Sequence, residues 1–145
     1  MSARKDPLRN SRFLLEIDGI VQAGFSEVTI PDSTAEPIEF RYGNDAPTMR
    51  KIPGLIKYAN VVLKWGITDS MEIFNWYKDV ADGKIGKSRK NLSILVLDEQ
   101  GNEAARWNFV QCWPTKYKAP DLNAKNNEIA IETLEIANEG LTRFK

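Results

Sequence analysis

Residues 39–57 of this 145-residue chain read EFRYGNDAPTMRKIPGLIK. The stretch begins as a β-strand and then passes through two prolines and two glycines without a regular pattern. Loops longer than about 12 residues are uncommon in compact domains and are usually functional or disordered. Bulky apolar residues here stand beside the basic pair Arg50-Lys51, and a purely solvated linker has no need of apolar groups. We therefore expect an arm, residues 43–58, that becomes ordered against another molecule.

Short segments that alternate apolar and polar residues lie on both sides of the arm and predict a mainly β protein. Asp18-Gly19 is a strong hairpin signal, whereas residues 114–124 read as an irregular connection. No repeat or change of composition divides the chain. We expect a single domain over residues 1–145, an antiparallel β-barrel or sandwich with one flanking α-helix and the long extended arm. The predicted strands are residues 11–17, 20–25, 27–30, 37–42, 60–65, 91–97, 103–113 and 128–136.

One α-helix is predicted over residues 70–81. Asp69 is a suitable N-cap, Glu72 three residues later fits a capping box, and Gly83 is a natural stop. Because apolar residues recur at helical spacing, we expect the helix to bury one stripe. The residues of this stripe are Met71, Ile73, Phe74, Trp76, Tyr77 and Val80.

The composition argues against catalysis. Basic and acidic residues number 20 each, so the net charge of zero gives no global attraction to nucleic acid or an anionic membrane. The absence of histidine removes the commonest general base and metal ligand. Cys112, the single cysteine, cannot form an internal disulfide or a thiolate metal site, and as a nucleophile it would need an activating base. We expect a protein made in the cytoplasm without signal peptide or transmembrane segment, with no enzyme activity, cofactor or metal.

Two charged motifs have simpler explanations than chemistry. The stretch Gly83-Lys-Ile-Gly-Lys-Ser88 has only two residues between its glycines, where a nucleotide-binding loop needs four, and it follows a predicted helix instead of a strand. The basic cluster of Lys84, Lys87, Arg89 and Lys90 is better explained as a solvated or subunit-contacting face. Glu128, Glu132 and Glu135 lie along one predicted strand and are better explained as edge or lumen charges than as catalysts.

An ordered set of motifs makes the chain resemble the tail tube protein family of contractile phage tails and contractile injection systems, related in fold to the type VI secretion tube protein. The resemblance implies hexameric rings that stack into a hollow tube for cargo or DNA, inside a sheath protein and between baseplate and tube-terminating proteins. It also implies assembly in the cytoplasm into a phage tail or tail-like particle, with extracellular release as one destination. The motifs are Asp6–Phe13 leading into Glu16–Gly19, Ala23–Val28, Arg50–Tyr58, Gly66–Asp69, and Asn127–Ala137 followed by Glu139-Gly140.

In such a tube the arm would reach neighbouring subunits and the adjacent ring. Apolar arm residues would anchor in a neighbour's groove, while Arg50 and Lys51 would pair with carboxylates at its rim. The predicted interface residues are Asn44, Met49, Arg50, Lys51, Ile52, Pro53, Gly54, Leu55 and Ile56, and candidates for the lumen are Arg106, Asn108, Glu128 and Glu132. The alternatives are a tube-end or baseplate-hub subunit of the same fold, or a soluble β-barrel binding module whose arm closes over a ligand.

Overall fold

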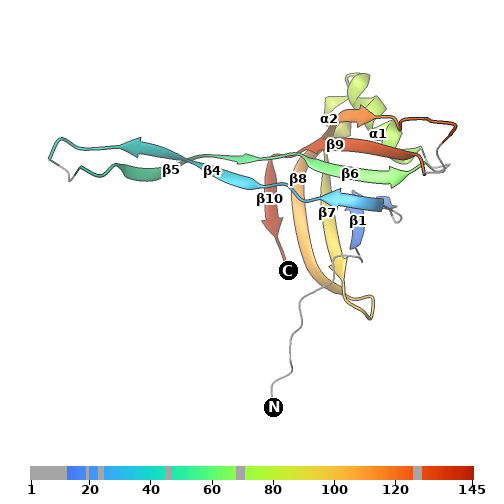
Figure 1. The fold of residues 1–145 in the computed structure, drawn as a ribbon, viewed down its shortest axis with the longest axis horizontal. Helices are drawn as coiled ribbons and strands as arrows, with labels where there is room; N and C mark the ends of the chain where they lie inside the picture. The colour runs from blue at the N-terminus through green and yellow to red at the C-terminus, as the bar shows by residue number, and fades with distance from the viewer. Residues whose placement is uncertain (1–12, 19, 23–24, 45–46, 68–70, 126–128) are drawn as a thin grey trace, which may run out of the picture.

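The computed structural model describes residues 13–18, 20–22, 25–44, 47–67, 71–125 and 129–145, and it is mainly β (Figure 1). The described strands are β1 Phe13–Ile17, β2 Ile20–Gln22, β3 Phe25–Thr29, β4 Ser33–Phe40, β5 Arg50–Tyr58, β6 Val61–Gly66, β7 Lys90–Leu97, β8 Glu103–Lys118, β9 Ile131–Ala137 and β10 Gly140–Arg143. Two helices, α1 Glu72–Ala81 and the single turn α2 Ile85–Ser88, lie between β6 and β7.

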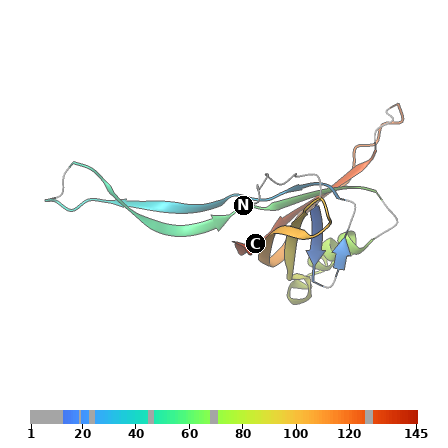
Figure 2. The same ribbon diagram turned by 90° about the horizontal axis from the view of Figure 1, so that it is seen from below.

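Eight strands form one antiparallel sheet in the order β2-β1-β7-β8-β9-β6-β3, with β10 added beside β8. The long strand β8 bends the sheet, because residues up to Cys112 pair with β7 and residues from Trp113 onward pair with β9. Gln111, at this bend, has a φ of 53°, a conformation that non-glycine residues rarely adopt outside bulges and turns. The end strands β2 and β3 are not paired with each other, so the sheet folds over itself like a sandwich and does not close into a barrel (Figure 2).

The core lies between the two halves of the bent sheet. Alternating residues of β6 point inward, and Val61, Leu63 and Trp65 share this buried face as the sequence predicts. They pack with residues of β1, β7, β8 and β9, among which Phe109 is fully buried. Apolar burial of this kind is the main contribution to folding stability, at roughly 25 cal/mol per Å² of apolar surface removed from water.

Helix α1 begins two residues later than predicted. Met71 occupies the N-cap position and makes no side-chain cap hydrogen bond, so the predicted cap at Asp69 is wrong for this helix, and Asp69 itself lies outside the described residues. The buried face is centred on Ile73 and Trp76, while Met71, predicted to belong to the stripe, is 55% exposed. The predicted stop is confirmed, because Gly83 has a φ of +81° directly after the helix.

The segment after α1 is more ordered than a solvated turn. Residues 85–88 form α2, whose Ser88 is buried. The indole N–H of Trp76 donates a hydrogen bond of 2.5 Å to the Ser88 carbonyl oxygen. This bond ties the two helices together beneath the exposed lysines of the basic cluster.

The strands at the carboxyl end also differ from the prediction. The expected irregular connection from residue 114 is strand as far as Lys118, with a shift of register between Pro114 and Lys116 where the proline cannot donate to β9. Strand β10 was not expected, because Asn138-Glu139-Gly140 reads as the end of structure. In the fold these residues only interrupt the pairing, and the chain continues along β8 with Gly140 opposite Val110.

Candidate subunit interface

The arm is a β-hairpin that stands away from the rest of the molecule. Strands β4 and β5 form a separate two-stranded sheet, and in the described part of the chain each pairs only with the other. Figures 1 and 2 show the hairpin projecting from the body along the longest axis of the molecule. The arm is extended as predicted, but the expectation that it lacks a regular pattern is wrong for its second half, which is the strand Arg50–Tyr58, paired from Ser33 opposite Tyr58 to Phe40 opposite Arg50.

The hairpin carries a β-bulge near its middle. The register shifts between Ala35, which pairs with Ile56, and Pro37, which pairs with Pro53. Gly54 lies in this bulge, and a Cβ atom there would stand 2.7 Å from the Glu36 carbonyl oxygen, closer than real Cβ contacts. Gly54, predicted as an interface residue, thus has a role inside the subunit, because the two strands can approach only if position 54 has no side chain.

Pro37 and Pro53 lie opposite each other just beyond the bulge. Neither has an N–H, so neither can donate a backbone hydrogen bond, whether to the other strand of the hairpin or to a strand outside it. Proline on an exposed edge is one of the ways in which proteins prevent unwanted strand pairing.

Side-chain contacts hold the arm in shape. Near the tip, the rings of Phe40 and Tyr42 meet edge to face at 5.5 Å, and the Arg50 guanidinium lies 5.5 Å from the centre of the Tyr42 ring. Nearer the base, the Lys57 ammonium is 2.6 Å from a Glu36 carboxylate oxygen. Arg50 is predicted to pair with a carboxylate of a neighbouring subunit. Within its own subunit its guanidinium lies over the Tyr42 ring, and the predicted pairing stays a prediction.

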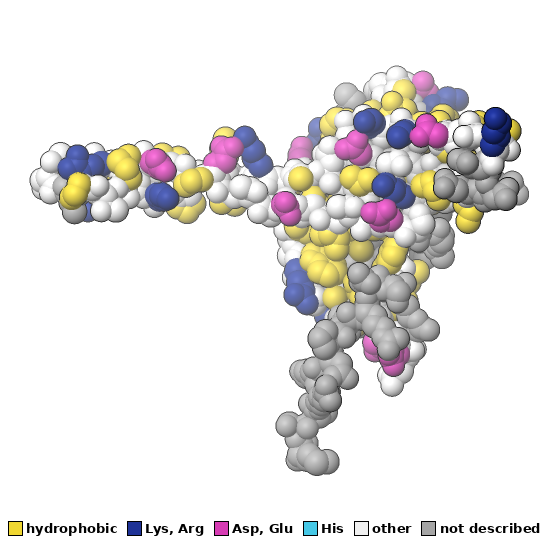
Figure 3. All heavy atoms as spheres, viewed as in Figure 1, with side chains coloured by type: hydrophobic (Ala, Val, Ile, Leu, Met, Phe, Trp, Pro, Cys, Tyr) yellow, Lys and Arg dark blue, Asp and Glu magenta, His cyan; other side chains and the backbone are white. Residues whose placement is uncertain are grey.

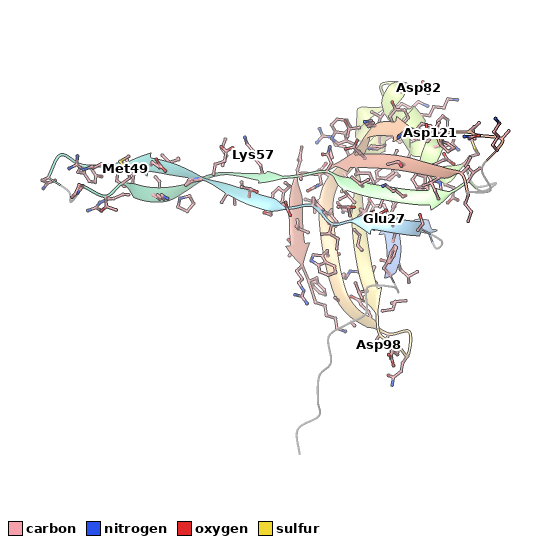
Figure 4. All side chains as sticks on the ribbon, in the orientation of Figure 1. Glu27, Met49, Lys57, Asp82, Asp98 and Asp121 are labelled. Carbon is pink, nitrogen blue, oxygen red and sulfur yellow. The ribbon has the colours of Figure 1, made fainter. Side chains whose placement is uncertain are left out.

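Bulky apolar side chains are exposed along the arm (Figures 3 and 4). Contiguous exposed apolar surface marks interaction sites, and a two-stranded hairpin has no core of its own in which to bury it. The hairpin brings together the predicted interface residues and adds two from β4 and its end, Ile38 and Tyr42. The apolar side chains and their exposed fractions are Ile38 50%, Tyr42 60%, Met49 46%, Ile52 46%, Leu55 74% and Ile56 57%.

Ile38 and Tyr42 were missed because residues 37–42 read as a strand of the body. The turn signal Gly43-Asn44, which lies between two apolar runs, could have identified the hairpin. Asn44 itself is exposed in the turn of the described arm.

A hollow of about 310 Å³ lies on the body where β6, α1, β8 and β9 meet, lined by Trp65, Ile67, Met71, Ile73, Phe74, Tyr117 and Glu132. Its lining is mainly apolar, and its polar side-chain groups are the Tyr117 hydroxyl, the Glu132 carboxylate and the indole N–H of Trp65. The hydroxyl donates a hydrogen bond of 2.5 Å to Glu132, and this bond is the main cause that raises the pKa of Tyr117 to about 12. Phe74 packs edge to face on Tyr117 with ring centres 5.1 Å apart.

A polar network covers the outward face of β1, β7 and β8. Arg106 lies 3.0 Å from a Glu16 carboxylate oxygen and 3.4 Å from one of Glu103. It also donates to Asn108 at 3.1 Å, and Ser93 donates to the same Asn108 oxygen at 2.7 Å. The structure thus brings together two of the predicted lumen residues, Arg106 and Asn108.

The other predicted lumen residues do not join this network. Glu132 lies in the hollow against Tyr117, and Glu128 is outside the described residues. Glu135, expected as an edge or lumen charge, lies 3.6 Å from Lys116. In the basic cluster, Arg89 lies 3.1 Å from a Glu139 carboxylate oxygen, which favours a structural explanation for that residue.

Cys112 is fully buried, and burial, with a smaller contribution from Asp18, raises the pKa of its thiol to about 12. A thiol of this kind is a packing group and not a nucleophile. Across the described ranges, no cluster of three or more histidine, cysteine, aspartate or glutamate side chains could hold a metal ion. Nor does any described helix have the length and apolar character to cross a membrane.

Several solved structures share this fold. The chain is similar, at 20% identity and a TM-score of 0.82, to a chain of the anti-feeding prophage baseplate, with 97% of each chain covered. It is similar, at 22% identity and a TM-score of 0.82, to a chain of the sheath-tube complex of the PVC extracellular contractile injection system, covering 94% of this chain and 90% of that one. Hcp1 from Flavobacterium johnsoniae shares 18% identity with a TM-score of 0.63 over 92% and 94% of the two chains.

These likenesses establish a common fold. No curated protein matches the sequence significantly. The family model described as T4-like virus tail tube protein gp19 matches residues 9–142, which is nearly the whole chain. The match includes the arm, the bent sheet and both helices. The chain therefore belongs to the T4-like tail tube protein family and is a structural subunit of a tube.

Proposed function

We propose that this subunit closes into hexameric rings, and that the rings stack into the hollow inner tube of a contractile tail or injection system. The observation that carries the proposal is the projecting hairpin, whose apolar side chains no described residue of the subunit covers. A group of exposed apolar side chains of this kind marks a surface that a partner covers. Membership of the tail tube family supports the same conclusion.

Ring closure would use the sheet edges. In the described part of the chain, β2 pairs only with β1, β3 only with β6, and β10 only with β8. Each of these strands offers unpaired backbone groups to a neighbouring copy. Pairing between edges in a closed ring satisfies these groups and removes the edges that would otherwise promote aggregation.

The arm would form the joint between subunits and between rings. Met49, Ile52, Leu55 and Ile56 supply the apolar contacts, with Asn44, Arg50 and Lys51 at their margin. Pro53 and Gly54 act indirectly, because they fix the shape of the hairpin. A hairpin already shaped by the bulge and the tip cluster loses less conformational entropy on docking than a free loop would.

The lumen would be lined by the face that carries Arg106 and Asn108. That face is polar, and its network sets one arginine against two carboxylates, Glu16 and Glu103, which leaves one carboxylate in excess. So small an excess of charge suits the passage of cargo, protein or DNA, without strong attachment. Glu132 lies in a different part of the body and is not a lumen residue in this arrangement.

The expected partners follow from the same role. A surrounding sheath protein, a baseplate and tube-terminating proteins would contact the tube, as the sheath-tube and baseplate assemblies of the similar proteins suggest. Assembly would take place in the cytoplasm, within a phage tail or a tail-like particle. A tube-end or baseplate-hub subunit is the second candidate, favoured by the similarity to a chain of a baseplate structure.

Native mass spectrometry and electron microscopy of the purified protein test the proposal. We expect sixfold rings and stacked tubes, and a stable monomer at high concentration would contradict it. Deletion of residues 44–54 removes the turn and the first part of β5, from Arg50 to Gly54, and should leave a folded β-domain that no longer stacks. If the truncated protein still formed tubes, the arm would not be the joint. A tube-end subunit would instead give single rings that cap a tube made by another protein.

A further inference from the structure

The arm and the apolar hollow lie at opposite ends of the subunit. Strand β6 begins at Val61 beside the base of the arm and runs away from it, and Trp65 near its far end lines the hollow (Figure 1). A subunit's own arm therefore points away from its own hollow. An arm that enters such a hollow must come from a second copy.

The hollow and the arm also have complementary chemistry. The hollow offers aromatic and aliphatic walls, with the exposed apolar side chains Ile67 and Met71 beside it, at 53% and 55% exposure. The carboxylate in the hollow belongs to Glu132. It accepts a hydrogen bond from the hydroxyl of Tyr117, a contact that brings no positive charge to the carboxylate. The site thus suits a group that is apolar with one cationic end.

The arm carries such a group. Arg50 and Ile52 are two residues apart on β5, so the alternation of a strand places them on the same face. Ile52 pairs with Ile38 across the hairpin, which makes a broad apolar surface next to the guanidinium. Lys51 lies between them and points to the opposite face.

We propose that the hollow lined by Trp65, Met71, Phe74 and Glu132 receives the arm of a second copy, with Ile52 against the apolar walls and Arg50 beside Glu132. The proposal rests on the proposed function and names the surface on which the arm docks. A contact between different surfaces at the two ends of each subunit is head-to-tail, and such contacts close into rings or, where the rotation does not close, extend into open assemblies. A tube of stacked rings requires contacts of this head-to-tail kind.

Two other hollows of the body fit the arm less well. One of about 230 Å³, lined by Val80, Gly83, Ser88, Arg89 and Trp113, carries an arginine where the basic arm needs a carboxylate. Another of about 300 Å³ lies between β1, β3 and β7, and its carboxylate, Glu27, already lies 3.6 Å from Lys64. The second of these hollows, which Val28 also lines, serves as the comparison site in the test.

Crosslinking between introduced cysteines tests the docking directly. The one native cysteine is buried, so new surface thiols would be the reactive ones. We expect Ile52→Cys protein, mixed with Met71→Cys protein, to give covalent dimers with a short bismaleimide during assembly. Lys51→Cys is the matched control on the opposite face of the same strand, and it should react several-fold less with Met71→Cys. Equal yields from the two arm positions would overturn the proposal. So would a higher yield of Ile52→Cys with Val28→Cys, which lies in the hollow between β1, β3 and β7, than with Met71→Cys.

Charge reversal gives a second readout. Arg50→Glu should raise the protein concentration needed for assembly about tenfold, a change that corresponds to about 1.4 kcal/mol. Mixing it with Glu132→Arg protein should restore assembly if the two positions meet. Absence of rescue, together with crosslinks outside the hollow, would overturn the docking site. The proposed function would still stand in that case if the unmodified protein formed tubes. Absence of any oligomer of the unmodified protein would overturn the proposed function and this inference together.

Discussion

Gly54 faces the backbone of Glu36 so closely that a Cβ atom would stand 2.7 Å from the Glu36 carbonyl oxygen. The contact lies in the bulge that shapes the arm. Gly54→Ala should therefore distort the hairpin and reduce tube formation strongly, with little change in the melting temperature of the body, whose core does not include the arm. Electron microscopy and thermal unfolding measure the two effects.

The matched control is Gly43→Ala in the same arm. A Cβ atom at position 43 would meet nothing within 4 Å, so this variant should assemble like the unmodified protein. If the two variants assembled equally well, the bulge would not control the arm.

Phe109 and Val110 are neighbours on β8 with opposite environments. Phe109 is fully buried in the core, whereas Val110 is 46% exposed. We expect Phe109→Ala to lower the free energy of unfolding by about 3–5 kcal/mol, because it leaves a cavity. Val110→Ala should change it by about 0.5 kcal/mol or less. Urea denaturation of the subunit compares the two, and a similar loss in both would contradict the assigned core.

Tyr117 links the stability of the fold to alkaline pH. Its hydrogen bond to Glu132 raises the pKa of the phenol from 10.0 to about 12. A raised pKa favours the neutral phenol in the folded state, so this contribution is fully present below pH 10 and is lost as the pH rises toward 12. In Tyr117→Phe the contribution is absent, and the difference in unfolding free energy from the unmodified protein should shrink between these two pH values. A difference that stays constant over the window would show that Tyr117 does not titrate in this way.

Cys112 should be inert in the folded subunit. Burial raises the pKa of its thiol from 9.0 to about 12, so below pH 9 it remains protonated and out of contact with solvent. We expect no alkylation by a maleimide reagent in native buffer and complete alkylation in denaturant, followed by mass spectrometry. Rapid alkylation of the native protein would contradict the buried position, and an introduced exposed cysteine provides the positive control.

Local sequence patterns were sufficient for much of the body. The inward face of β6, the hairpin after Ile17 and the stop of α1 at Gly83 each depend on signals that lie within a few residues of one another. These features follow from strand alternation, turn chemistry and the conformational freedom of glycine. The β-rich class follows from their repetition along the chain.

Features that depend on distant partners could not be read in this way. Strand β5 contains a proline and a glycine, and only its pairing with β4 and the close approach at Glu36 make it a strand. The extension of β8 beyond Pro114 and the existence of β10 likewise require the neighbouring strands β8 and β9. The hollow escaped prediction entirely, because Trp65, Met71 and Glu132 come from three separate elements.

The facing prolines of the arm have a consequence for the fidelity of construction. Neither Pro37 nor Pro53 can donate a backbone hydrogen bond, so backbone pairing with a foreign strand, which any sequence could supply, is interrupted at this level of the hairpin. Recognition then depends on side chains, and side chains differ from one tube protein to another. Where several tail-like particles are built in one cell, such an arm would reject the subunits of the others.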